Sequence, residues 1–290
     1  MAAPKCPYCG TLNSVSEPRC FQCGEPLPGP VGREVRRLLT TALGRDLWVT
    51  KLFLGLCWLG FALMLLDNAR SSFAGLPLGM GSGGRIAPSA MLRAGVLVEP
   101  VVHEWWRYVT AVFFHFNLLH IAFNSVWLWS LGRTLEPELG SGRFTLLYLV
   151  TGVAGFGANA LLGPMPLTGG ASGAVFGLFG ALVGYSLGRK SSLWREHLSR
   201  LVIFVVLSAL LGAGMSGGGV NNAAHIGGAV AGVGVGFLFA VERRRPAAHR
   251  WFGYFGVLGV IAVVAALVAT QLSPTWQAYR EHVESPEGIW

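Results

Sequence analysis

Four polar residues within apolar stretches of the chain have the types and spacing needed for nucleophilic catalysis. Ser172 follows a Gly-Gly-Ala turn, and His225 lies in a later stretch rich in glycine and alanine. A serine hydroxyl beside an imidazole is the minimum for nucleophilic attack with general-base help. His120 and Asn124 are spaced i, i+4, so on a helix they project from one face. We therefore predict Ser172 as nucleophile and His225 as base, with His120, Asn124 and the Ser172 backbone N–H as donors to an oxyanion.

Acidic residues are too few and too distant to complete a triad. The chain has two aspartates, Asp46 and Asp67, and both lie outside the apolar stretches. Glu136 lies at the opposite end of its stretch from His120. A soluble triad would use a carboxylate to orient the histidine. The sequence therefore favours a Ser–His dyad.

Composition places these residues in a membrane protein. The 290 residues are 52% hydrophobic and 12% charged, and 41 of them are glycine. Soluble domains carry about 25% charged residues, whereas glycine is common where helices pack closely in lipid. Although the net charge is +8, the basic residues form short clusters between apolar runs, so we expect no nucleic-acid partner.

Seven apolar runs are long enough to be read as membrane-spanning helices, because a span needs about 20 apolar residues. The predicted fold class is an all-α polytopic membrane protein. The runs lie near 47–66, 118–135, 144–163, 172–188, 199–214, 222–241 and 252–272.

Arginine clusters predict the orientation of these spans. They occur before the first run, after the fourth and after the sixth, whereas the connections between the third and fourth and the fifth and sixth runs carry no charge. The positive-inside rule then places the N-terminus in the cytoplasm and the C-terminus outside, in a multi-pass protein of the cell (inner) membrane. The long segment 67–117, with four arginines, is a mild contradiction. In this orientation the four polar residues share one depth, within about two helical turns of the outer boundary.

Small residues at every fourth position predict that the fourth and sixth runs touch. Such small-xxx-small faces let two helices approach closely, and Ser172 and His225 each lie one residue from such a face. An isolated serine in a membrane helix is usually a packing residue, but four polar groups at one depth favour a site. The small residues are Gly173, Gly177 and Ala181 in the fourth run, and Ala224, Gly228, Gly232 and Gly236 in the sixth.

Several motifs resemble those of the rhomboid family of intramembrane proteases. The nucleophile motif reads Gly170-Ala171-Ser172-Gly173, and the histidine motif reads Ala224-His225-Ile226-Gly227-Gly228. The second run opens with His115-Phe116-Asn117-Leu118-Leu119-His120-Ile121-Ala122-Phe123-Asn124, preceded by Trp106-Arg107 and followed by Glu136. These matches fall in order over residues 103–240.

The resemblance implies a six-helix rhomboid core at 47–241, followed by residues 242–290 with a cytoplasmic loop, a seventh transmembrane helix and an outer tail. It implies a serine endopeptidase that cleaves single-span or polytopic membrane proteins near the outer leaflet, with Ser172 as nucleophile and His225 as base. It also implies His120 and Asn124 as oxyanion stabilisers, and Trp106-Arg107 as structural parts of the first loop. Phe176 stands where well-known bacterial members have tyrosine, so we expect its ring to pack under the imidazole without a hydroxyl.

The N-terminal residues 1–30 carry two C-x-x-C-G knuckles separated by ten residues. Four thiolates from two such knuckles suit a tetrahedral zinc ion, and the glycine after each pair allows the positive φ of a tight turn. We predict a zinc-ribbon-like cytoplasmic module that binds structural Zn²⁺ and docks a cytoplasmic protein, joined to the core by a basic linker at 31–46 that contacts the lipid bilayer. Iron binding and a redox pair are the alternatives. The predicted ligands are Cys6, Cys9, Cys20 and Cys23.

Other functions fit the sequence less well. A catalytically inactive rhomboid-like protein would bind membrane helices without cutting them, but such relatives commonly lose the serine or the histidine. A transporter would be expected to contain internal repeats, and a zinc metalloprotease would require an H-E-x-x-H motif. Neither feature is present in the sequence.

Overall fold

The computed structural model describes most of the apolar part of the chain and a few N-terminal residues. Two predicted zinc ligands, Cys9 and Cys23, lie outside the described residues, as do the basic linker 31–46 and the C-terminal tail. The described residues are 6, 11–14, 17–22, 24, 27, 47–68, 86–98, 103–162, 167–213, 220–242 and 249–278.

Each of the seven predicted apolar runs forms one long helix, so the prediction of an all-α fold is confirmed. Short elements precede α5, namely α3 (Pro88–Ala94), β1 (Leu97–Val98), α4 (Arg107–Thr110) and the 3-10 helix η2 (Ala111–Phe113), and β2 (Leu167–Thr168) precedes α7. The long helices are α2 (Trp48–Asn68), α5 (Leu118–Leu139), α6 (Ser141–Leu162), α7 (Ser172–Gly188), α8 (Trp194–Ala213), α9 (Asn222–Glu242) and α10 (His249–Gln271).

Length and composition support a multi-pass membrane protein. Within the described residues, α2, α6, α9 and the C-terminal helix (as Tyr254–Ala278) are long and apolar enough to span a bilayer. The segment Arg107–Phe113 with α5 makes a fifth span if the pair, bent by 92°, counts as one. Because α7 has only 17 residues, it is about 25 Å long, which is less than the roughly 30 Å of a hydrocarbon core. The number of seven spans stays a prediction.

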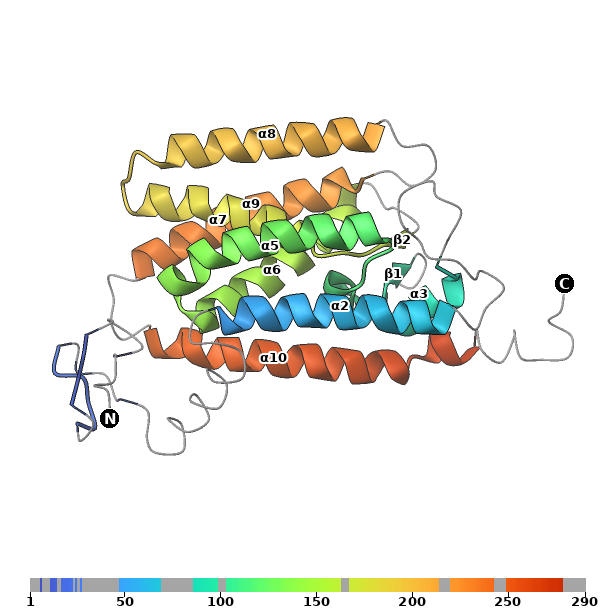
Figure 1. Ribbon diagram of the computed structural model, residues 1–290, viewed down its shortest axis with the longest axis horizontal. Helices are drawn as coiled ribbons and strands as arrows, with labels where there is room; N and C mark the ends of the chain where they lie inside the picture. Colours follow the sequence, from blue (N-terminus) through green and yellow to red (C-terminus); the bar gives the residue numbers. More distant parts are fainter. Residues whose placement is uncertain are drawn as a thin grey trace, which may run out of the picture.

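The axes of the long helices are roughly parallel, with α8 at the top and α10 at the bottom of the view (Figure 1). Helix α7 is the central element, since nearly all its residues are buried. Its most extensive contact is with α9, while α10 packs on α6 and α2 packs on α5.

A buried carboxylate joins the end of α5 to the beginning of α2. Glu136 of α5 accepts hydrogen bonds from the first backbone N–H groups of α2, at 3.0 and 2.9 Å, where the helix dipole favours an anion.

The contact between α7 and α9 depends on the predicted small-residue faces. A Cβ added at Gly228 or Gly232 would overlap the carbonyl oxygen of the facing residue, Gly173 or Gly177. Gly236 meets Ala181 in the same way. Since the partner numbers rise together along both helices, α7 and α9 are parallel, and the predicted contact between these faces is confirmed.

We predict that Gly232→Ala destabilises the protein, because its Cβ would overlap the backbone of α7, which cannot move aside as a flexible side chain would. The expected cost is about 1–3 kcal/mol, measured as a lower denaturation midpoint in detergent micelles. Gly234→Ala is the matched control, because no described atom lies within 4 Å of its added Cβ and alanine favours the helix. Equal stability of the two variants would contradict this packing.

Candidate active site

Ser172 is the first residue of α7, at the end of a tight turn. Gly170 in that turn has φ of +123°, in the left-handed region that favours glycine. A Cβ at Gly170 would also lie 2.6 Å from Cε1 of His120, so the absence of a side chain lets the His120 ring pack on the turn. The first N–H groups of α7 have no carbonyl partner within the helix and lie beside the Ser172 side chain.

The turn before Ser172 is held by the segment that leads into α5. The N–H of Gly170 donates to the carbonyl of Ala111 at 2.8 Å, and the N–H of Ala171 donates to Nε2 of His115 at 3.2 Å. β2, just before the turn, pairs with β1 in an antiparallel register that aligns Leu97 with Thr168. The sequence comparison with the rhomboid motif gave His115 no role, and this contact supplies one.

His225 lies in the first turn of α9, directly beside Ser172. Its Nε2 is 2.8 Å from the Ser172 Oγ, and its ring stacks on Phe176 with centroids 4.2 Å apart and planes at 14°. The predicted packing of Phe176 under the imidazole is therefore confirmed. The structure brings Ser172 and His225 into hydrogen-bond contact, while their catalytic roles stay predictions.

Asn221, which the sequence analysis missed, sets the start of α9. Its side-chain oxygen accepts from the N–H of Ala224 at 2.9 Å, the usual action of an N-cap residue. Its amide nitrogen donates at 2.8 Å to both Asn159 of α6 and Thr168 of β2. The beginning of α9 is thus fixed against the strand that leads to Ser172. The pair Asn221-Asn222 ahead of an apolar run was a readable cap signal.

A second hydroxyl contacts the other nitrogen of the imidazole. The Oγ of Ser208, on α8, lies 3.0 Å from Nδ1 of His225. With the proton on Nδ1 donated to Ser208, Nε2 is left as the acceptor for the Ser172 hydroxyl, because a neutral imidazole has one donor and one acceptor nitrogen. Nothing in the sequence pointed to Ser208, because its position beside His225 depends on how α8 packs.

His120 and Asn124 lie on the same face of α5, as their spacing predicted. The N–H of His120 is capped by the side chain of Asn117 at 2.8 Å, and the Asn124 amide donates to the His120 carbonyl at 2.8 Å. Asn124 also borders the same small gap in the packing as His115 and Ala171, the residue before Ser172. Both predicted oxyanion donors therefore lie beside the turn that carries Ser172.

The described part of the N-terminal module fits the predicted knuckles in two respects. Cys6 and Cys20 are both buried, with exposures of 2% and 1%. Gly24, after the second pair, has φ of +71° and its N–H bonds to the Cys20 carbonyl at 2.8 Å, as expected for a tight turn. Among the described residues no group of three or more potential metal ligands occurs, so zinc binding stays a prediction.

The part of the chain that contains this site is similar to known proteins. The Rhomboid domain matches residues 102–242. The rhomboid protease GluP of Bacillus subtilis (strain 168) is 38% identical over 129 residues, which are 44% of this chain and 25% of GluP. The rhomboid protease GlpG of Salmonella choleraesuis (strain SC-B67) is 35% identical over 154 residues, which are 51% of this chain and 53% of GlpG. GlpG of Salmonella newport (strain SL254) is 34% identical over the same length.

Residues 102–242 therefore match the Rhomboid domain, and this part of the chain is similar to the rhomboid proteases. The chain spans about a quarter of GluP and about half of GlpG. Ser172, His225, His120 and Asn124 all lie within the matched domain.

Proposed function

We propose that the protein is an intramembrane serine endopeptidase in which Ser172 and His225 form the catalytic dyad. The observation that carries this proposal is the 2.8 Å contact between Ser172 Oγ and His225 Nε2. A nucleophile and its base within hydrogen-bond reach are the signature of covalent acyl transfer. The relation to rhomboid proteases supports the same chemistry.

The reaction proceeds in two proton-balanced halves. His225 Nε2 takes the Ser172 proton while Oγ bonds to the substrate carbonyl carbon, and the resulting imidazolium gives that proton to the leaving amide nitrogen as the C–N bond breaks. Water then cleaves the acyl-enzyme by the same route and restores the serine. The negative charge on the carbonyl oxygen is stabilised by the Ser172 N–H, His120 and Asn124.

We propose transmembrane helices, cut near the outer leaflet, as the substrates. An intact helix keeps its carbonyls in internal hydrogen bonds, so substrates with small or helix-weakening residues near the cleavage point are favoured. The shortness of α7 supports a recessed Ser172, because a helix that does not cross the whole hydrocarbon core can begin below the surface. With the N-terminus in the cytoplasm and the C-terminus outside, water reaches the site from outside. Labelling of a cysteine introduced near the C-terminus by a membrane-impermeant reagent in intact cells tests this orientation, and the outside placement predicts that it is labelled.

We predict that Ser172→Ala and His225→Ala each lower cleavage of a single-span substrate in liposomes by about three orders of magnitude or more. Ser130→Ala, an exposed serine of α5, serves as the control and should cleave at the wild-type rate. Labelling of Ser172 by a fluorophosphonate gives the independent readout. Cleavage by all variants alike would reject the dyad, and a wild type that neither cleaves nor labels would favour an inactive helix-binding relative.

Ser208 should act as a positioning residue for the His225 ring. Ser208→Ala removes one hydrogen bond to Nδ1, so we expect kcat to fall about tenfold with KM nearly unchanged. Ser208→Thr keeps the hydroxyl and should recover most of the rate. A wild-type kcat in Ser208→Ala would exclude this role.

We further propose that Cys6, Cys9, Cys20 and Cys23 bind one structural zinc ion in a module that docks a cytoplasmic protein. The burial of Cys6 and Cys20 supports this proposal. The full-length protein should carry about one zinc per chain by elemental analysis, and replacement of Cys6 and Cys20 by alanine should remove it. Cys57→Ala, in α2, is the control and should retain the metal. Wild-type protein without zinc would contradict the proposal.

A further inference from the structure

A fully buried ion pair joins Glu104, just before α4, to Arg107, the first residue of α4. Nε of Arg107 lies 2.6 Å from Oε2 of Glu104, and the two side chains are 0% and 1% exposed. A buried pair is costly unless its remaining donors and acceptors are satisfied. The residues that supply the remaining hydrogen bonds are therefore needed to keep this pair stable in the interior.

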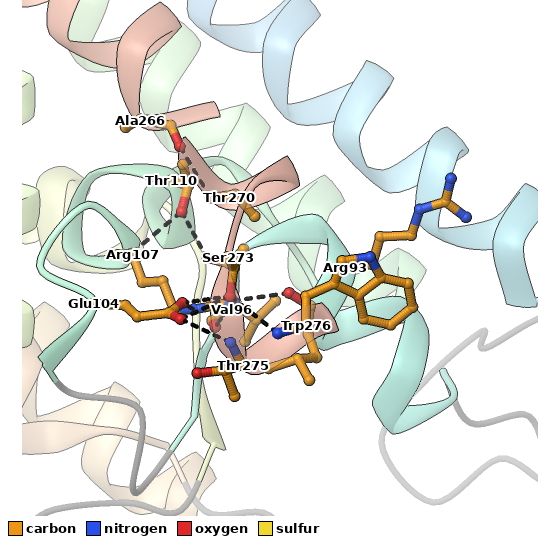
Figure 2. Close-up of polar contacts among 12 residues, drawn as sticks. Arg93, Val96, Glu104, Arg107, Thr110, Ala266, Thr270, Ser273, Thr275 and Trp276 are labelled. Carbon is orange, nitrogen blue, oxygen red and sulfur yellow. Dashed lines mark hydrogen bonds and ion pairs between the residues drawn. The ribbon is translucent and has the colours of Figure 1, made fainter. Parts of the chain in front are cut away.

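One partner comes from the far end of the sequence, just after α10. The Ser273 hydroxyl donates to Glu104 at 2.7 Å and accepts from Arg107 Nη2 at 3.2 Å. It also accepts from the N–H of Trp276 at 3.1 Å, so its donor and both lone pairs are used. Figure 2 shows Ser273 beside both the carboxylate of Glu104 and the guanidinium of Arg107, and the backbone N–H of Thr275 also donates to Glu104.

The carboxylate is held in its charged form by these contacts. Burial by itself raises the pKa of Glu104, but the hydrogen bonds from its three partners and the charge of Arg107 outweigh it. They hold the pKa below its ordinary value. Glu104 is therefore ionised at neutral pH, and removal of Ser273 leaves its buried carboxylate with one hydrogen-bond donor fewer.

Arg107 and Thr110 also hydrogen-bond to the stretch of chain just before β1. Arg107 Nη1 donates to the carbonyls of Leu92 and Val96 at 2.8 and 3.2 Å. The Thr110 hydroxyl donates to the Gly95 carbonyl at 2.7 Å, and a Cβ at Gly95 would meet Thr270 of α10 as well as Thr110. The end of α10 thus packs directly on the turn that begins β1.

The same segment holds the nucleophile turn. β1 pairs with β2, and Ala111 and His115 accept the N–H groups of Gly170 and Ala171. Hydrogen bonds linked by short stretches of backbone therefore connect Ser273, through the buried ion pair, to the two residues before Ser172.

We propose that α10 is a positioning element of the active site, and that Ser273 fixes the nucleophile turn through Glu104 and Arg107. This inference rests on the proposed protease function. In this proposal the helix that follows the rhomboid domain contributes to catalysis indirectly. Ser273 touches no reacting atom, and its effect reaches Ser172 through backbone contacts.

The test compares Ser273→Ala with Thr275→Ala in the full-length protein. Thr275 contacts Glu104 through a backbone N–H, which alanine retains, so this control should behave as wild type. For Ser273→Ala we expect kcat per fluorophosphonate-titrated site to fall about tenfold, with KM within about twofold, because substrate binding is kept and alignment is lost. Ser273→Cys, with a weaker donor, should fall in between and provides the comparison if the alanine variant yields little folded protein.

Two outcomes separate this inference from the function on which it rests. A wild type that is neither labelled nor active rejects the protease itself. An active wild type, with Ser273→Ala and Ser273→Cys showing the same kcat per titrated site as Thr275→Ala, rejects the positioning role even if both variants unfold at lower temperature.

Discussion

The approach of α7 to α9 is the constraint on which the site depends. Two helices in lipid gain little from hydrophobic burial against each other, so their association depends on close packing and hydrogen bonds. Here the backbone carbonyls of Gly173 and Gly177 occupy the space that side chains at Gly228 and Gly232 would need. Only at that separation can the hydroxyl of Ser172, at the start of one helix, reach the imidazole of His225, in the first turn of the other.

Polar contacts at the helix ends then fix the positions of the chains within this close packing. Asn221 ties the beginning of α9 to β2 and α6, and Glu136 ties the beginning of α2 to the far end of α5. Arg143 forms a partly buried ion pair with Glu242 at 2.7 Å, which joins α6 to the end of α9. Each of these contacts satisfies a backbone group or a charge at the end of a helix. Each one therefore fixes where that helix end lies, which apolar packing alone would not do.

The sequence predicted the helices and the central pair because both signals are local. Seven apolar runs have the length of spans, and a small residue at every fourth position marks a contact face whatever its partner. Matching two such stripes predicted that the helices touch, and the structure supplies the register, in which Gly228 faces Gly173. Ser208 and Ser273 could not be found in this way, because each is a single hydroxyl whose partner lies on a different element of the fold. The positioning role proposed for α10 could not be predicted from the sequence either, because the contact joins Ser273 to Glu104, 169 positions away.

The separation of Ser172 Oγ and His225 Nε2 in an experimental structure of the full-length protein in a lipid bilayer tests the account most directly. The account predicts a hydrogen bond of about 3 Å, with Gly228 packed on the Gly173 carbonyl. A separation of more than about 5 Å, too long for any hydrogen bond, with α7 and α9 no longer in contact through their glycines, would contradict it.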